Sequence, residues 1–286
     1  MRIGLYSNPE KDPQYKIACQ TAAYLRQAGV QTVVSAAYAE TPLAGHVDQV
    51  RENYADCDVL ISLGGDGTFL SAVHLEGSTA IPILGINLGS VGFLPEVMPD
   101  DLKSAMEALT SGRYRIHQRM LLDVLCCGPD GQTLETGFAL NDAVVSRGGH
   151  SRILMLDLLI DDELVERIPG DGLIVATPTG STAYSLSASG PIVHPAMNLI
   201  MMTPICPHTL HNRSYIAPPD STVSVRIGPY PQDAVLAIDG RQEILLASGS
   251  SVRIRKAEQA LNMIRLGDDR FYAMLPRKIQ ARGSVI

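Results

Sequence analysis

The sequence has 286 residues, 45% of them hydrophobic, with a net charge of −7 at neutral pH and an isoelectric point near 5.5. This length is sufficient for one large domain or two ordinary ones, and the hydrophobic share allows a buried core. The acidic balance, without any cluster of lysine and arginine, argues against a general nucleic-acid binder and against attachment to anionic membranes.

The sequence also indicates the cellular compartment in which the protein resides. No apolar run is long enough to cross a bilayer, and the first residues become polar too early for a signal peptide. The cysteines are odd in number and irregularly spaced, which indicates neither a disulfide framework nor a metal site. They are Cys19, Cys57, Cys126, Cys127 and Cys206. We therefore expect a cytoplasmic protein with no metal held by its own side chains.

The first part of the chain alternates between strand and helix patterns. We expect strands at residues 2–7, 30–35, 59–63 and 81–87. We expect helices at residues 16–28, 46–54 and 100–109, and one that starts after the glycines that follow residue 63. This order predicts an α/β domain at residues 1–115 with a parallel sheet, in which ligands bind beyond the carboxyl ends of the strands.

The glycine-rich turn after residue 63 has the sequence Gly64-Gly65-Asp66-Gly67-Thr68. A strand that ends in glycines and restarts as a helix presents backbone N–H groups and a positive helix end to phosphate. Asp66 cannot attract phosphate, so it has another task, such as holding a metal or abstracting a proton. The alternative is a tight strand-to-helix turn capped by Thr68. A second glycine loop, at residues 88–94, is expected at the same edge of the sheet.

The pattern changes near residue 116 to short alternating segments separated by turns. We expect strands at residues 121–127, 133–140, 143–146, 154–160, 173–176, 222–227, 235–238 and 251–255. This spacing predicts a β-rich, antiparallel, sandwich-like domain at residues 116–255, with residues 256–286 packing back onto the first domain. An apolar run at 197–202 fits either the interior of the second domain or a contact with a partner.

One stretch of the second domain is rich in small polar groups. From Asp171 the chain crosses an apolar strand and enters a Pro-Gly turn, where most residues as far as Ser187 carry a hydroxyl group. Hydroxyls and a tyrosine, Tyr184, at the start of a helix suit hydrogen bonding to the ribose, amide and phosphate groups of a nucleotide. The alternative is a well-capped helix whose serines are merely exposed.

Two shorter motifs in this domain are weaker indicators. Asn141 and Asp142 stand at the entrance of an apolar strand, where such a pair usually caps a turn or a bulge. His208 and His211 are three positions apart but have no acid or cysteine at zinc-ligand spacing, so we do not expect a metal site there.

Taken together, these residues resemble the NAD kinase family, the ATP- or polyphosphate-NAD 2′-phosphotransferases. The resemblance covers nearly the whole chain. Its most specific parts are residues 64–68, 141–142, 171–187 and 204–210. The first motif alone is weak, because diacylglycerol kinases, sphingosine kinases and phosphofructokinases have similar Gly-Gly-Asp-Gly turns.

The resemblance implies transfer of the γ-phosphoryl group of ATP, or of polyphosphate, to the 2′-hydroxyl of the adenosine ribose of NAD, which gives NADP. It implies that Asp66 is the catalytic residue that activates this hydroxyl. It assigns the donor phosphates to Gly64, Gly65, Gly67 and Thr68. It assigns NAD binding to Asp66, Gly67, Phe93, Asn141, Asp142, Asp171, Thr179, Thr182, Ala183, Tyr184 and Ser187.

The chain departs from the family pattern at two of these positions, because many members have glutamate in place of Asp142 and some have serine in place of Thr179. The resemblance also implies which partners the chain has. Asp171 matches an acid that contacts the nicotinamide end from a neighbouring subunit, which implies a homodimer or homotetramer. We expect Mg²⁺, or another divalent cation, to arrive with ATP, because Mg²⁺ binds phosphate oxygens and waters more readily than a dedicated protein cage. The alternatives are a lipid or sugar kinase with the same glycine turn, and a non-catalytic dinucleotide-binding protein.

Overall fold

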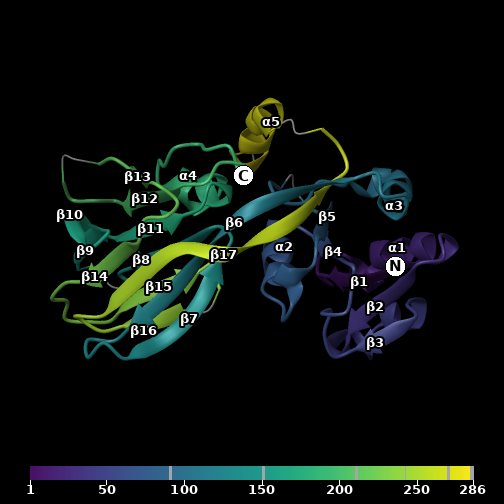
Figure 1. Cartoon of the computed structure of the whole chain (residues 1–286), viewed down its shortest axis with the longest axis horizontal. Coiled ribbons are helices and arrows are strands. Elements are labelled where there is room, and N and C mark those ends of the chain that lie inside the picture. Colours follow the sequence, from purple (N-terminus) through teal and green to yellow (C-terminus); the bar gives the residue numbers. More distant parts are fainter. Residues whose placement is uncertain (90–91, 150–151, 210–211, 242, 269–270, 284–286) are drawn as a thin grey trace. The chain divides into compact units, whose positions relative to one another are not determined.

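A computed structural model describes residues 1–89, 92–149, 152–209, 212–241, 243–268 and 271–283 (Figure 1). Four residues of the loops discussed above, Ser90, Val91, Leu210 and His211, lie outside the described residues. The chain forms two compact units. The N-terminal unit consists of Met1–Gln118 and the segment from Leu261 onward, and the C-terminal unit is Arg119–Ala260.

The N-terminal unit is built on a parallel sheet. Its strand order is β3 (Gln49–Arg51), β2 (Gln31–Ser35), β1 (Arg2–Ser7), β4 (Val59–Gly64) and β5 (Ile83–Asn87). β4 and β5 are buried along their whole length, as expected for central strands of a sheet covered on both faces. The predicted parallel α/β sheet is confirmed.

Three helices of this unit follow from local sequence signals. α1 (Lys16–Gln27) begins where the Asp12 carboxylate accepts the backbone N–H groups of Ile17 and Ala18. α2 (Asp66–Val73) follows the glycine turn directly. α3 (Leu102–Thr110) buries residues 102, 105, 106 and 109, which form one helical face. The predicted helices at these three places are confirmed.

The helix predicted at residues 46–54 is wrong. A short 3₁₀ turn, η3 (Pro42–His46), is followed by β3, which pairs with β2 at Val33 and Gln49. The Asp48 carboxylate accepts hydrogen bonds from the backbone N–H and the hydroxyl of Thr32. These tertiary contacts outweigh the weak local helical spacing, because a strand's conformation depends mainly on its neighbours.

The C-terminal segment completes the N-terminal unit. β17 (Ser251–Arg265) begins in the C-terminal unit, and its end pairs in parallel with β5 at Met263 and Ile83. The Glu96 carboxylate accepts the N–H groups of Leu266 and Gly267 and pairs with Arg265 at 3.1 Å. The chain then forms α5 (Phe271–Gly283). The strand expected at residues 251–255 is therefore the start of a much longer one.

The C-terminal unit contains an antiparallel sheet of six strands. Their order is β13 (Tyr215–Ala217), β12 (Ile200–Ile205), β11 (Gly172–Ala176), β8 (Asp142–Ser146), β15 (Ala234–Ile238) and β16 (Glu243–Leu246). This sheet shows where part of the apolar run at 197–202 packs. Ile200, Met201 and Met202 are buried in β12. The second half of the run therefore packs inside the unit, whereas Met197 at its start is 51% exposed.

A second antiparallel layer packs against this sheet. It contains β10 (Glu163–Gly170), β9 (Leu154–Ile160), β14 (Val223–Ile227) and the first part of β17, and β6 (Arg115–Cys127) pairs with β7 (Thr133–Ala139). Leu156 and Val223 of this layer share one core with Leu173 and Leu236 of the six-stranded sheet. The predicted antiparallel, sandwich-like architecture is confirmed, although β10, β12, β13 and β16 were not anticipated as strands.

A buried tyrosine in the connection between β3 and β4 bonds to two strands of the N-terminal unit, β1 and β2. The Tyr54 hydroxyl donates to the carbonyl of Leu5 at 2.9 Å and accepts the N–H of Ser35 at 3.1 Å. We expect Tyr54→Phe to destabilise the protein by about 1–2 kcal/mol, because both buried partners lose a hydrogen bond. Thermal unfolding followed by circular dichroism measures the change.

The matched control for this variant is Tyr24→Phe. In the described part of the chain, the hydroxyl of the half-buried Tyr24 makes no hydrogen bond, so its removal should leave the unfolding midpoint unchanged. Equal midpoints for both variants would contradict the role given to the Tyr54 hydroxyl.

Candidate functional site

The glycine turn leaves an open face at the start of α2. Gly65 is the N-terminal capping residue of the helix, and Asp66 is its first residue. A Cβ atom on Gly64 would lie 2.2 Å from the Thr68 hydroxyl, so only glycine fits there. A Cβ on Gly65 or Gly67 would have no neighbour within 4 Å, so a ligand can approach this backbone closely. The alternative in which Thr68 caps the helix is wrong.

Asp66 is held by the second glycine loop. Its Oδ1 atom accepts the N–H groups of Phe93 at 2.8 Å and Leu94 at 3.0 Å, and Oδ2 accepts the Phe93 N–H at 3.1 Å. A Cβ on Gly92 would lie 2.4 Å from Oδ1, so this contact requires glycine. The two glycine loops, predicted to share one edge of the sheet, therefore meet at the Asp66 carboxylate.

Two residues near this carboxylate were not anticipated from the sequence. Asn8, directly after β1, donates its side-chain N–H to the Thr68 hydroxyl at 3.2 Å. Lys278 of α5 places its ammonium nitrogen 5.2 Å from the centroid of the Phe93 ring, within cation–π range. Asn8 could have been identified by its place at the carboxyl end of a strand, but no sequence signal indicated Lys278.

A second group of predicted residues meets in the C-terminal unit. Asn141, just before β8, accepts the Thr177 N–H at 2.9 Å through its backbone carbonyl. A Cβ on Gly180 would lie 2.1 Å from the same carbonyl oxygen, so the turn η6 (Thr179–Thr182) rests directly on Asn141. Within the described residues, the Asn141 carboxamide has no hydrogen-bond partner. It is therefore available to a ligand.

The hydroxyl groups of the segment from Thr179 to Ser187 are of two kinds: some bond to other parts of the protein, and one buried hydroxyl has no partner among the described residues. Ser181 exchanges hydrogen bonds with the Val193 backbone, and Ser185 bonds to Thr203. These two serines hold the turn. By contrast, the Thr179 hydroxyl is buried without a hydrogen-bond partner in the described part of the chain.

The remaining predicted positions of this segment surround that turn. Thr182 is buried, and its hydroxyl donates to the Thr179 carbonyl at 3.3 Å. Ala183 is half-buried, whereas Ser187 is exposed. Tyr184 starts the short helix α4 (Tyr184–Ser187) and is 46% exposed. An aromatic ring this exposed beside buried polar groups is typical of a binding surface.

Asp142 is buried beside a second carboxylate. Its pKa rises from 3.8 to about 7, first because of burial and second because of the negative charge of Asp239. A hydrogen bond from the Tyr184 backbone N–H opposes this rise. Asp142 thus changes charge near neutral pH, a property common at functional sites.

Asp171 lies apart from this group. It precedes β11, whereas Asp142 pairs with Ala176 at the other end of that strand. At about 3.3 Å per residue, the two acids are separated by roughly 16 Å. Asp171 accepts a hydrogen bond from Arg147 at 2.7 Å, so this arginine is a further residue that the sequence did not indicate.

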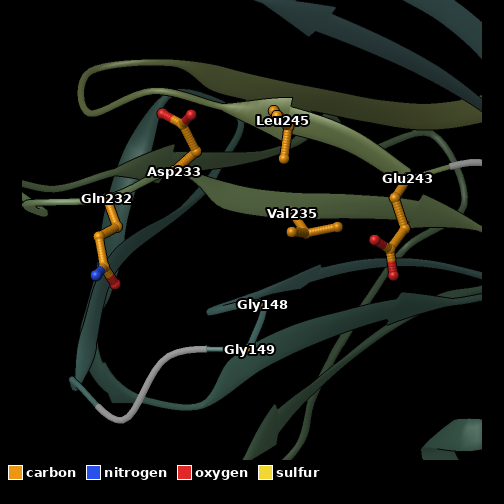
Figure 2. Close-up of a pocket in the computed structure, with 7 residues that line it drawn as sticks. All are labelled: Gly148, Gly149, Gln232, Asp233, Val235, Glu243 and Leu245. Atoms are coloured by element: carbon orange, nitrogen blue, oxygen red, sulfur yellow. The ribbon is translucent and has the colours of Figure 1, made fainter.

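A hollow of about 550 Å³ lies elsewhere in this unit, beside β15 and β16 (Figure 2). It is lined by Gly148, Gly149, Gln232, Asp233, Val235, Glu243 and Leu245. None of the predicted site residues lines it, and its two carboxylates would repel the phosphates of a nucleotide. We therefore do not assign the nucleotide site to this hollow.

The described residues contain neither a metal-binding cluster nor a membrane-spanning helix. No group of three or more histidine, cysteine, aspartate or glutamate side chains there could hold a metal ion. Likewise, in this part of the chain no helix is both long and apolar enough to cross a membrane.

Comparison with known proteins identifies the family. The model of the ATP-NAD kinase N-terminal domain matches residues 3–114, and that of the C-terminal domain matches residues 140–266. A protein named NAD kinase from Moorella thermoacetica is 38% identical over 283 residues, which are 99% of this chain and 90% of that protein. The chain belongs to the NAD kinase family. It is therefore an enzyme, a nucleotide-binding kinase, and the lipid or sugar kinase and the non-catalytic alternatives are set aside.

A further relative and two solved structures are also similar to this chain. A protein named NAD kinase from Ruminiclostridium cellulolyticum is 39% identical over 282 residues, or 98% of each chain. The crystal structure of yeast NADH kinase complexed with NADH has a TM-score of 0.85 and 26% identity, and the match covers 100% of this chain and 87% of that one. An NAD kinase from Archaeoglobus fulgidus in complex with ATP, 24% identical, has the same fold, with a TM-score of 0.73 over 98% of this chain and 99% of that one.

The close contact at Gly92 gives a test of the Asp66 position in this kinase. Asp66 is the expected catalytic residue, so we expect Gly92→Ala to lower kcat on the order of 100-fold, because the new methyl group displaces its carboxylate and a small displacement of a catalytic group has an effect of this size. In the same loop, a Cβ on Gly89 has nothing within 4 Å, so Gly89→Ala is the matched control. The rate of NADP formation is measured for both variants. Similar rates for Gly92→Ala and Gly89→Ala would contradict the close contact between Gly92 and the Asp66 carboxylate.

The pKa of Asp142 predicts how stability depends on pH. Folding raises the pKa of Asp142, so the folded protein favours the neutral carboxyl group. The resulting contribution to the free energy of unfolding is fully present below about pH 4 and is lost as the pH rises through 7. Asparagine at this position never ionises. We therefore expect Asp142→Asn to become more stable relative to the wild type between pH 4 and pH 8, by a few kcal/mol. Urea unfolding at each pH measures the difference, and a constant difference would contradict the prediction.

Proposed function

We propose that this chain transfers the γ-phosphoryl group of ATP to the 2′-hydroxyl of the adenosine ribose of NAD, with Asp66 as the residue that takes the hydroxyl proton. The observation that supports this most directly is the Asp66 carboxylate, which the Phe93 and Leu94 N–H groups hold beside the open backbone of the glycine turn. A positioned carboxylate next to free backbone donors matches what a hydroxyl and a phosphate require.

The donor phosphates would bind at the start of α2. Its first backbone N–H groups and the positive end of its dipole face the open side of Gly65 and Gly67. Gly64 allows the close approach of Thr68. Because Asn8 donates to the Thr68 hydroxyl oxygen, the hydroxyl hydrogen is left to donate to a phosphate oxygen.

The residues of the chain would contribute mainly position and charge. Phosphoryl transfer passes through a loose transition state, so catalysis depends on alignment of the two oxygens and on stabilisation of the phosphate charge. Asp66 accepts the proton of the attacking hydroxyl as the new bond to phosphorus forms. Lys278, beside Phe93, adds a positive charge on this side of the N-terminal unit.

NAD would be held largely by the C-terminal unit. The Asn141 carboxamide and the buried Thr179 hydroxyl are polar groups without partners in the described residues, and Asp142 lies next to them. Thr182, Ala183, Tyr184 and Ser187 form the surrounding surface. In the N-terminal unit, Phe93 would lie by the adenine. A ligand would supply the missing hydrogen bonds, since buried polar groups are rarely left unpaired.

We also propose that the active form is a homodimer or homotetramer. Asp171 is roughly 16 Å along the sheet from Asp142, estimated at about 3.3 Å per residue, so it serves the same NAD molecule more readily from a neighbouring subunit. There, the Arg147 guanidinium that pairs with Asp171 would hold its carboxylate in place.

Mg²⁺ would enter as part of the ATP substrate. The described residues offer no group of three acidic or histidine ligands, which fits a cation held by phosphate oxygens and waters. When bound with ATP, the cation spreads the charge of the phosphates. We propose a cytoplasmic location for this chain, with NAD and ATP as its substrates and neither nucleic acid nor membrane as a partner.

The variant Asp66→Asn tests the proton acceptor. We expect kcat for NADP formation to fall by about 100-fold or more, because asparagine cannot take the hydroxyl proton. The fold and the affinity for NAD should persist, since the asparagine oxygen still accepts N–H groups from the second glycine loop. A coupled assay with an NADP-specific dehydrogenase measures turnover.

The control for this variant is Asp100→Asn, an exposed aspartate of the same unit with no hydrogen bond among the described residues. Its turnover should equal that of the wild type. Near-normal turnover of Asp66→Asn would reject the role of Asp66 as proton acceptor.

A further inference from the structure

Asp239 is a buried carboxylate that the reaction described above does not use. It follows β15 and is 7% exposed. Its Oδ1 atom accepts the N–H groups of Asn141 at 2.7 Å and Asp142 at 3.1 Å, and Oδ2 accepts the Leu140 N–H at 2.8 Å. One side chain therefore binds three successive backbone amides of the segment that carries the NAD-binding pair.

The turn around Asp239 also contacts this segment through its backbone. Asp239 and Gly240 have positive φ angles of 50° and 65°, and the Arg241 N–H donates to the Ile238 carbonyl at 3.0 Å. This is the type of turn that closes a two-residue hairpin. The Asp239 N–H donates to the Asp142 carbonyl at 2.9 Å, which extends the pairing of β15 with β8 by one residue.

The same segment is fixed from its other side. The Thr177 hydroxyl donates to the Leu140 carbonyl at 2.5 Å, and the Thr177 N–H donates to the Asn141 carbonyl at 2.9 Å. Donors on one side and acceptors on the other leave the backbone little freedom. The directions of the Asn141 and Asp142 side chains are thereby determined.

Asp239 also acts on the charge of Asp142. The groups that face this carboxyl are Asp239 from the turn after β15 and the Tyr184 N–H from α4. Its neighbour in register on β11, Ala176, is uncharged, and on the β15 side the register continues to Asp239 itself. Two carboxyls in one buried place do not ionise together easily. Asp239 accepts three backbone N–H groups, whereas Asp142 accepts the one from Tyr184.

We propose that Asp239 is a positioning residue of the NAD site, which holds the backbone under Asn141 and Asp142 and acts on the charge of the Asp142 carboxyl group that meets NAD. This inference depends on the proposed contact between Asp142 and NAD. It extends that proposal, because it makes NAD affinity dependent on pH through a residue that does not touch the substrate.

The variant Asp239→Asn tests this inference. Asparagine also tolerates a positive φ, so the turn should form, but it brings one acceptor oxygen and no charge. The dissociation constant of NAD for the full-length protein would be measured by calorimetry from about pH 5 to about pH 9. In the wild type, affinity should rise with pH as Asp142 ionises.

Two changes are expected in Asp239→Asn. The midpoint of the pH dependence should move down by roughly one pH unit, because a nearby negative charge is removed. At the highest pH, where Asp142 is ionised in both proteins, affinity should be about tenfold weaker, because backbone hydrogen bonds are lost. A purely structural role of Asp239 would lower thermal stability and leave the midpoint in place, and that result would overturn the proposal.

Two further variants complete the test. Asp142→Asn keeps Asp239 and should abolish the pH midpoint, so a midpoint that persists in this variant overturns the proposal even if Asp239→Asn does not fold. Asp233→Asn, an exposed aspartate in the same hairpin, should reproduce the wild-type curve. These are binding measurements, so their failure is distinct from failure of the proposed reaction, which would show as normal turnover in Asp66→Asn.

Discussion

In each of the two units, a carboxylate that accepts backbone N–H groups from a distant loop fixes the segment that carries predicted site residues. Asp66 does so for Phe93 and Leu94 in the N-terminal unit, and Asp239 does so for the residues before β8 in the C-terminal unit. A loop without regular hydrogen bonding has unpaired amides, and a charged acceptor can satisfy two or three of them at once. The irregular loops that carry the predicted site residues thereby gain a fixed shape.

The architecture could be predicted from the sequence because its signals are local. Apolar runs bounded by glycine, and the switch from helical to alternating patterns near residue 116, determine which sheets form. The strand β3 was missed because it depends on pairing with β2 and on the bonds between Asp48 and Thr32. Such contacts between residues distant in sequence leave no periodic pattern.

The site could be predicted in part for the same reason. The glycine turn, the Asn141–Asp142 pair and the hydroxyl-rich turn are contiguous motifs, and the structure brings the last two together. Asn8, Arg147 and Lys278 were missed because each is a single residue whose position depends on the fold. The turn at Asp239 and Gly240 was visible in the sequence, but its hydrogen bonds to the Leu140–Asp142 backbone were not.

The N-terminal unit is discontinuous in sequence, and this affects how it is made. Its core includes Ile264, and β5 has the end of β17 as one of its two neighbours. On a ribosome, the first 118 residues emerge well before these partners are synthesised. Until then β5 has one unpaired edge, and the Glu96 carboxylate lacks the amides it later binds. Exposed apolar edges of this kind favour aggregation. The unit is therefore complete only when β17 has paired with β5 and Glu96 has bound its two amides. A fragment that ends near residue 118 would keep the unpaired edge of β5 exposed.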